Sequence, residues 1–179
     1  MKRIHYKAVS ITLVPFLFLL MGCTEKVDKN TDEYIQTLEA VLHNALTGPN
    51  DKLKEILKTK DGKERATALA KYEANLYKDY FANETAYNDF ISRYGTVLMT
   101  ESYKNKYTLK VYNIEYERTH SKENIYNFSI QLHYQKEGKE SPEVKVITGQ
   151  ADLNDNHQIE RMLIRVNDLW GSFPKHKRK

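Results

Sequence analysis

The chain has very little cysteine, since Cys23 is its only thiol. A single cysteine excludes an internal disulfide, even in a protein exported to an oxidising compartment. Glycine is scarce too, with seven residues in 179, and no glycine-rich loop that could cradle a phosphate is present. The sequence also lacks a Ser-His-Asp arrangement and histidines at metal-ligand spacing. We therefore expect no enzyme, no catalytic residue, no cofactor and no metal.

A broad excess of charge of one sign is also missing. The formal net charge is +4, but three cations lie in the first seven residues and four more lie within residues 175–179. Residues 23–174 carry 21 Lys+Arg against 24 Asp+Glu. A nucleic-acid-binding domain spreads its basic charge over one face, so we expect no nucleic-acid partner. The basic tail, residues 171–179, either contacts anionic headgroups or wall polymers or is simply a solvated chain end.

The N-terminus has the layout of a secretory signal. Lys2, Arg3 and Lys7 precede an apolar run from Ala8 to Met21, which is the order of a charged n-region and an h-region. As a helix this run is about 21 Å long, too short for the roughly 30 Å hydrocarbon core of a bilayer. Pro15 also interrupts it. Residues 1–22 are therefore predicted to be a signal peptide.

The end of this segment, Leu20-Met21-Gly22-Cys23, resembles the bacterial lipobox. The resemblance implies cleavage between Gly22 and Cys23 and a diacylglycerol on the Cys23 sulfur, which holds the protein at the extracytoplasmic face of the cell membrane. Two acyl chains anchor a protein durably, whereas one binds only marginally. The alternatives are a plain signal peptide with an incidental cysteine and an uncleaved N-terminal anchor.

Residues 23–30 are expected to be a tether and residues 31–170 a single domain. Helical spacing of apolar residues predicts four helices. The first is capped by Asn30, with Glu33 completing a capping box, and is stopped by Gly48-Pro49. The others are a short helix capped by Asn50 or Asp51, a helix from about Lys63 to Phe81, and one capped by Asn83 and released at Gly95.

After Gly95 the apolar period changes to two, which predicts four antiparallel strands joined by short polar loops. They are placed at Tyr107–Arg118, Ile125–Lys136, Val144–Leu153 and Ile159–Val166. In the first strand the apolar phase changes before Tyr112, and in the third it changes between Val146 and Ile147. A one-residue change of phase predicts a β-bulge in each. The fold class is therefore α+β, with N-terminal helices packed on a curved four-stranded sheet.

This order of elements, with the Thr47–Asp51 break and the sheet at 107–166, resembles the NTF2-like and cystatin-like folds. It resembles in particular the small lipobox-bearing members found in Gram-positive envelopes. The resemblance covers roughly residues 31–166 and implies a cone-shaped domain with a possible pocket and a tendency to pair sheet to sheet, hence a possible homodimer. It implies no particular chemistry, because this scaffold serves many functions.

The remaining candidates for chemistry have simple structural explanations. The loop Asp152–Asn156 has alternating oxygens like a calcium loop, but His157 replaces the required glycine and Leu163 the bidentate glutamate. The histidines have no local carboxylate partner; those considered are His43, His120, His133 and His157. On the apolar strand faces only tyrosines could line a cone, namely Tyr112, Tyr126 and Tyr134, and such residues are usually core.

The sequence thus favours a lipid-anchored, extracytoplasmic interaction module of the cell envelope, with an envelope protein or a wall polymer as partner. The alternative is a module that binds a small apolar or peptide ligand inside the cone. A cavity lined by tyrosines would support that alternative, whereas a cone filled by Leu38, Val41 and Leu42 would oppose it. An NTF2-like enzyme is the third and weakest hypothesis.

Overall fold

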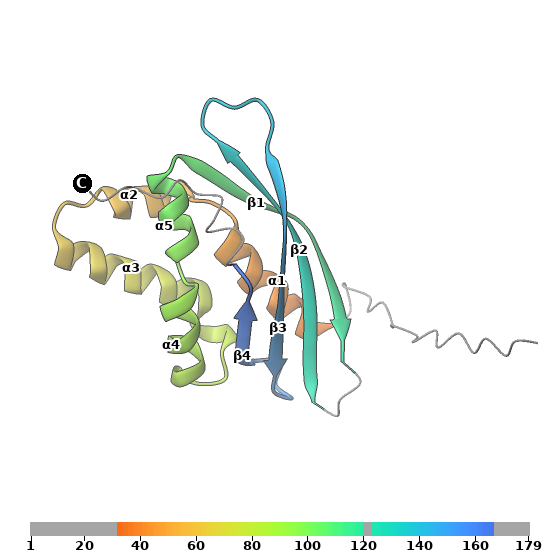
Figure 1. The fold of residues 1–179 in the computed structure, drawn as a ribbon. Coiled ribbons are helices and arrows are strands. Elements are labelled where there is room, and N and C mark those ends of the chain that lie inside the picture. Colours follow the sequence, from red (N-terminus) through yellow and green to blue (C-terminus); the bar gives the residue numbers. More distant parts are fainter. Residues whose placement is uncertain (1–31, 120–122, 167–179) are drawn as a thin grey trace, which may run out of the picture.

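The computed structural model describes residues 32–119 and 123–166, as helices followed by strands (Figure 1). The helices are α1 (Glu33–Leu46), α2 (Asp51–Lys58), α3 (Gly62–Tyr77), the 3-10 turn η1 (Lys78–Tyr80), α4 (Glu84–Arg93) and α5 (Val97–Lys104). The strands are β1 (Tyr107–Arg118), β2 (Asn124–Lys136), β3 (Glu143–Leu153) and β4 (Ile159–Ile164). The protein is therefore α+β, as the sequence predicts.

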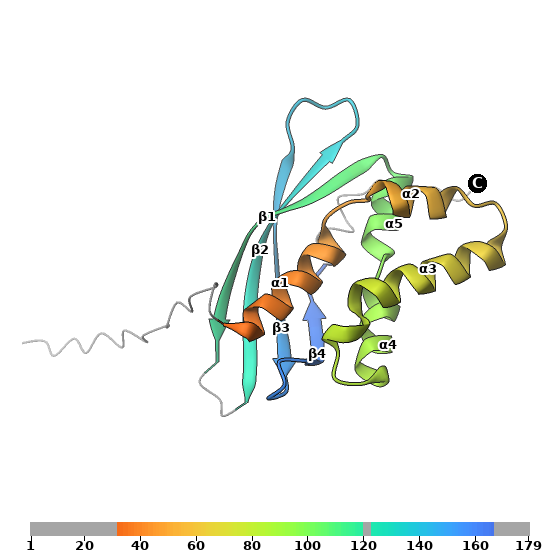
Figure 2. The same ribbon diagram turned by 180° about the vertical axis from the view of Figure 1, so that it is seen from behind.

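The strands form one antiparallel sheet in the order β1-β2-β3-β4. Helix α1 crosses one face of this sheet, in front of the strands in Figure 2. We call the face that α1 covers the inner face and the opposite one the outer face. Because each strand turns alternate side chains to the two faces, one face can be apolar and buried while the other stays polar.

The inner face carries the main core. The α1 residues that turn toward the sheet are all fully buried: Ile35, Leu38, Val41, Leu42, Ala45 and Leu46. They meet the inward residues of β2, which are also buried: Tyr126, Phe128, Ile130, Leu132 and Tyr134. The predicted alternation of β2 is therefore confirmed, and burial of this apolar area is the main force that holds α1 on the sheet.

One of the two predicted bulges is present and the other is not. The register between β1 and β2 shifts between Val111 and Asn113, as the change of phase in β1 predicts. The pairing of β2 with β3 runs without a shift past Val146 and Ile147, so the bulge predicted there is wrong. Val144 and Val146 are simply exposed on the outer face, which produces the same sequence pattern without an extra residue.

All four predicted helices are present, but the start of the first and the end of the third differ from the prediction. Asn50 and Asn83 are the N-caps of α2 and α4, each accepting a backbone N–H of the first turn. The N-cap of α1 is Asp32 rather than Asn30, because its carboxylate accepts from the first free N–H groups. The third helix ends at Tyr77 and gives way to η1 instead of continuing to Phe81.

Helix α5 is an additional helix that the sequence pattern does not predict. It lies between α4 and β1, with Leu98, Met99 and Ser102 buried. Its first turn is held from outside, because the Glu73 carboxylate of α3 accepts from the backbone N–H and the hydroxyl of Thr96 at 2.9 and 2.8 Å. A partner 23 residues away thus supplies the capping interaction that the local sequence lacks.

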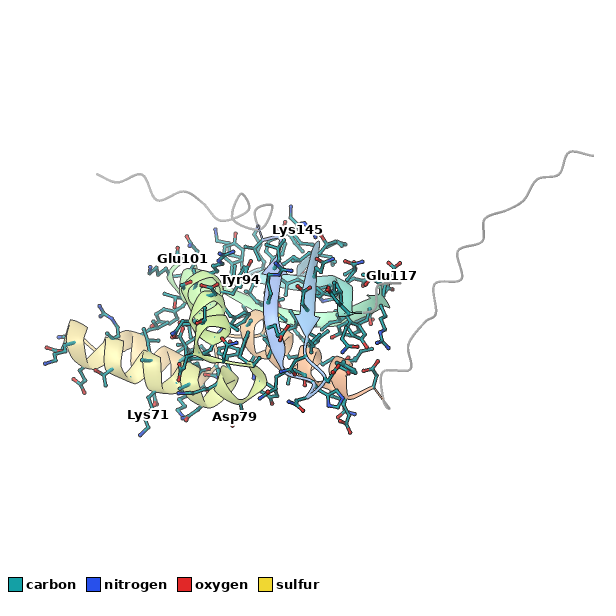
Figure 3. The ribbon with its side chains drawn as sticks, turned by 90° about the horizontal axis from the view of Figure 1, so that it is seen from below. Lys71, Asp79, Tyr94, Glu101, Glu117 and Lys145 are labelled. Atoms are coloured by element: carbon teal, nitrogen blue, oxygen red, sulfur yellow. The ribbon has the colours of Figure 1, made fainter. Side chains whose placement is uncertain are left out.

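Helices α2 and α3 extend away from the sheet (Figures 1 and 2). Seen from below in Figure 3, Lys71 on α3 and Glu117 on β1 lie on opposite sides of the molecule. The two helices have a small core of their own, in which Leu53 and Tyr72 pack with Met99 of α5. None of the helices within 32–119 and 123–166 has the length and apolar composition needed to span a membrane.

Candidate functional site

The predicted lipidation and cleavage residues, Cys23 and Gly22, lie outside the described residues, as do His120 and the basic tail. The nearest described residue to Cys23 along the chain is Asp32, the N-cap of α1, nine residues further on. We call the contacts around this point the tether junction. It consists of Asp32, Glu33, Tyr34, Arg118, Tyr126 and His157.

Asp32 performs two tasks at the tether junction. One carboxylate oxygen, Oδ1, accepts from the backbone N–H groups of Tyr34 and Ile35 at 2.9 and 3.3 Å, which caps α1. The other, Oδ2, accepts from the Tyr126 hydroxyl of β2 at 3.0 Å. Burial, and next the hydrogen bond to Asp32, raise the pKa of Tyr126 well above the ordinary tyrosine value. The neutral hydroxyl therefore stays a donor, and α1 is tied to an inner strand of the sheet.

His157 provides a second tie from the turn between β3 and β4. Its Nδ1 lies 2.9 Å from Glu33 Oε2, and its ring meets the ring of Tyr34 edge-on with centroids 4.3 Å apart. The sequence supplies no local carboxylate for a histidine, but the fold brings Glu33 to this one from 124 residues away. His43 is exposed on α1, and His133 stacks on Tyr112.

Arg118 completes the tether junction at the end of β1. Its guanidinium lies about 6 Å from the ring centres of Tyr34 and Tyr126 and donates to Asn124 Oδ1 at 2.6 Å. Asn124 in turn donates to Asp155 Oδ1 at 3.2 Å. These groups already have partners, and the arrangement fixes the first turn of α1 against the ends of three strands. These contacts hold the start of α1 on the sheet, and we refer to this as the clamp.

The loop Asp152–Asn156, whose oxygens alternate like those of a calcium loop, is a hydrogen-bonded turn. Asn154 Oδ1 accepts from the backbone N–H groups of Asn156 and Gln158, each at 3.0 Å, as turn-forming asparagines do. Asp152 accepts from Arg161 Nε at 2.8 Å on β4. In the described part of the chain no three His, Cys, Asp or Glu side chains gather to hold a metal ion.

The interior of the predicted cone is occupied by α1. Leu38, Val41 and Leu42 are fully buried against the sheet, which is the arrangement that opposes an internal ligand. Tyr126 and Tyr134 are buried core residues. Their hydroxyls bond to carboxylates at the margin of the core, with Tyr134 donating to Glu143.

Tyr112, by contrast, is not inside the cone. It lies at the β1 bulge, is 67% exposed and stacks on His133 with centroids 4.7 Å apart and planes within 7°. Its expected place on the inner face was therefore wrong, since the bulge turns its side chain to the outer face. The strand pairing sets His133 opposite Val144, and Gln131 opposite Val146. Val144 and Val146 are 55% and 60% exposed.

Tyr112, His133, Val144 and Val146 thus form one patch across three strands, which we call the outer patch. Next to the outer patch, this face continues along β2 and β3 with polar, uncharged residues and ends at Ile125 and Asp152; the polar residues are Asn127, Ser129, Gln131, Thr148 and Gln150. Gln150 donates to Asn127 at 2.9 Å across the strands. An exposed apolar patch with a polar rim is typical of an interaction surface.

Comparison with protein-family models, with curated proteins and with solved structures finds no match. The function is therefore inferred from the tether junction, the filled inner face and the outer patch. Sequence patterning alone missed the outer patch, because it placed Tyr112 on the apolar strand face and explained the phase of Val144 and Val146 by a β-bulge. The signal that could have found it is the even alternation of Val144 and Val146 against Ile147, Gly149 and Ala151.

Proposed function

We propose that the protein is a lipoprotein anchored through Cys23 at the extracytoplasmic face of the cell membrane. The lipobox-like Leu20-Met21-Gly22-Cys23 behind a short apolar run carries this proposal. The start of α1 is compatible with this anchor, because Glu33 lies ten residues after Cys23 and a chain of that length reaches at most about 36 Å. The order of elements further supports a likeness to NTF2-like and cystatin-like domains.

At the membrane the protein acts as a non-enzymatic interaction module that binds an envelope protein or a wall polymer through the outer patch. The observation that favours this role over ligand binding is the contrast in burial. The inner face is filled by Leu38, Val41 and Leu42, whereas Tyr112 and the two valines remain accessible outside. Exposed aromatic residues anchor many protein interfaces because they bury a large area at low entropic cost.

The anchor is tested by metabolic labelling of cells with a clickable fatty acid. The full-length chain is expected to take up the label and to sediment with membranes. A Cys23→Ala variant is expected to lose the label and to accumulate as a precursor or in the medium. A Cys23→Ala chain that still carries the label and stays with the membrane contradicts the proposal.

The interaction role is tested by photo-crosslinking in cells. A photoreactive phenylalanine analogue replaces Tyr112 in the outer patch and, as a matched control, the exposed Lys71 of α3. We expect a discrete adduct from position 112 alone, and mass spectrometry then identifies an envelope protein, a wall fragment or a second copy of the chain. Equal adducts from both positions, or none from position 112, contradict a role for the outer patch.

A further inference from the structure

Half of strand β3 has a partner strand on only one side. β3 contains eleven residues, but β4 pairs with it only from Gly149 to Leu153. One more bond, just beyond β4, runs from Arg165 N to Thr148 O at 2.8 Å. Along residues 143–147, β2 continues on one side, and no strand in the described part of the chain lies on the other. We call residues 143–147 the open edge.

The open edge presents backbone groups that can pair with one more strand. Thr148 turns its carbonyl toward the side of β4, and residues two apart in a strand direct their N–H and C=O groups to the same side. Val144 and Val146 therefore direct theirs to the side that β4 does not reach. The start of β3 and the turn before it project beyond the helices at the top of Figure 1. The helices thus leave room for an added strand at this edge.

The side chains of the open edge alternate in character between the two faces of the sheet. Val144 and Val146 are exposed on the outer face, whereas Glu143 and Lys145 lie on the opposite face and carry opposite charges. Tyr134 donates to Glu143 through one carboxylate oxygen, Oε2, so the other oxygen can accept from a cation. The edge therefore holds an anion and a cation two residues apart.

This charge pattern is complementary to itself in one antiparallel register. Two identical antiparallel strands are related by a two-fold axis, and with the axis at Val144, Glu143 of each copy faces Lys145 of the other. The result is two opposite-charge pairs. With the axis at Glu143 or at Lys145, two like charges face each other. With the axis at Val146 or further on, the pairing reaches Thr148, whose carbonyl already accepts a bond within its own molecule.

We propose that two copies of the chain pair through their open edges, antiparallel and with the two-fold axis at Val144. The N–H and C=O of Val144 bond to those of Val144 in the second copy, and the N–H of Val146 donates to the carbonyl of Pro142 in the second copy. Glu143 of each copy binds Lys145 of the other. The sheets of the two copies then form one continuous sheet.

This pairing lies beside the outer patch and does not cover it. A strand added at an edge bonds in the plane of the sheet, whereas side chains project from its two faces. The valine side chains therefore stay on the outer face, and the outer patches of the two copies become neighbours across the axis. The inference goes beyond the proposed function and does not depend on it, because edge pairing requires neither the lipid anchor nor another partner.

The register is tested by disulfide trapping of the full-length chain in detergent. The Cα atoms of a hydrogen-bonded antiparallel pair lie about 5.5 Å apart, a separation that a disulfide can bridge. Val144→Cys is therefore expected to give a covalent dimer on mild oxidation. Val146→Cys is the matched control, because the two copies of this position are separated by four residues along the strands, about 14 Å. The unsubstituted chain, which keeps Cys23, gives the background, and mass spectrometry identifies the link.

Charge reversal in the Val144→Cys background tests the pairs of Glu143 with Lys145. Lys145→Glu places two carboxylates opposite each other, so the yield of trapped dimer is expected to fall about tenfold. Adding Glu143→Lys restores opposite charges in the reverse order and is expected to recover the dimer. Circular dichroism of each variant checks that the fold is retained.

Hydrogen exchange of the unsubstituted full-length chain gives a reading that needs no substitution. The amides of Val144 and Val146 are expected to exchange faster as the chain is diluted, because dissociation exposes them. Those of Ile130 and Leu132, which lie inside the sheet, are expected to stay unchanged.

Three results overturn the proposal. The first is a covalent dimer that forms equally from Val144→Cys and Val146→Cys, or from neither. The second is a yield that does not respond to charge reversal, or exchange at Val144 and Val146 that is independent of concentration. The third is a dimer in light scattering without a link at position 144, since the copies then meet through another surface. None of these results bears on crosslinking from Tyr112, so the proposed function of the outer patch is judged separately.

Discussion

The two faces of the sheet are built from the same strands and differ in almost every physical respect. On the inner face, side chains of β2 such as Ile130 and Leu132 are fully buried beneath α1. On the outer face, the next residues along the strands are polar or, in the outer patch, apolar and exposed. The difference teaches that burial on the inner face supplies most of the stability. Residues of the outer face can therefore be substituted at little cost to folding.

The strongest way to test this contrast is to remove buried volume beneath α1. Leu42→Ala is expected to lower the free energy of unfolding by about 2–5 kcal/mol, because it leaves a cavity in the core. Val146→Ala on the outer face is the matched control and should change it by less than about 0.5 kcal/mol. Urea denaturation followed by circular dichroism measures both. Similar losses in the two variants would show that the faces are not energetically distinct.

Alkaline pH is expected to destabilise the main core, in which Tyr77 and Tyr116 pack. Burial raises the pKa of Tyr77 and Tyr116 far above the ordinary value of about 10. A folded pKa above the unfolded one stabilises the fold fully below about pH 10, and this contribution is lost as the pH rises further. We expect the urea midpoint to fall above pH 10, and tyrosinate absorbance to reach its full amplitude only on unfolding. Complete ionisation of all tyrosines in the folded chain would contradict this.

Packing at Gly149 tests how closely the inner face is filled. A methyl group at this position would overlap the ring of Phe128 and the carbonyl of Leu163, so Gly149→Ala is expected to cost about 1–3 kcal/mol. Gly62→Ala is the control, since nothing lies within 4 Å of its added methyl group and alanine favours the helix. Thermal unfolding distinguishes them, and a neutral Gly149→Ala would mean that this part of the sheet can relax.

Substitutions at the tether junction test whether the packing of α1 on the inner face depends on the first turn of this helix. Asp32→Ala removes the N-cap of α1 and the acceptor of the Tyr126 hydroxyl, and we expect a loss of about 1–2 kcal/mol. Asp32→Asn keeps an acceptor oxygen and should lose less. Hydrogen exchange of the first turn of α1 shows whether the loss is local. An unchanged free energy of unfolding in Asp32→Ala would show that the contacts of Asp32 do not stabilise the fold.

The smallest effect on stability is expected in the outer patch. Tyr112→Ser removes the stacking on His133 at an exposed site, so the unfolding free energy should move by less than about 0.5 kcal/mol. Capture of the partner found by crosslinking should nevertheless fall strongly. A variant that loses stability but keeps its partner would reverse the division of roles between the two faces.

The sequence was most informative where burial and periodicity agree. In β2 and α1 every inward position is apolar, so pattern alone predicts both the elements and the face they bury. Tyr112, Val144 and Val146 mislead the same reasoning, because it assumes that apolar side chains point inward. The alternation of Val144 and Val146 against Ile147 fits a β-bulge as well as two exposed valines, so the pattern alone does not decide between them.

Interactions between segments that are distant in the sequence are the second feature that sequence patterns do not predict. Helix α5 has only eight residues, and its start depends on Glu73 from α3. The pair of Glu33 with His157 and the bond from Tyr126 to Asp32 join residues more than 90 positions apart. Each requires the assembled sheet before it can form, so neither spacing nor composition predicts it.

The double bonding of Asp32 has a mechanical consequence. If the proposed anchor at Cys23 is correct, a pull from the membrane enters the described fold at Asp32, whose carboxylate accepts a hydrogen bond from the Tyr126 hydroxyl. Strand β2 has neighbours on both sides, so the load passes into the middle of a sheet and is shared among its ladders. In the proposed anchored protein, the bond from Tyr126 to Asp32 would thus resist the unwinding of α1 from its first turn.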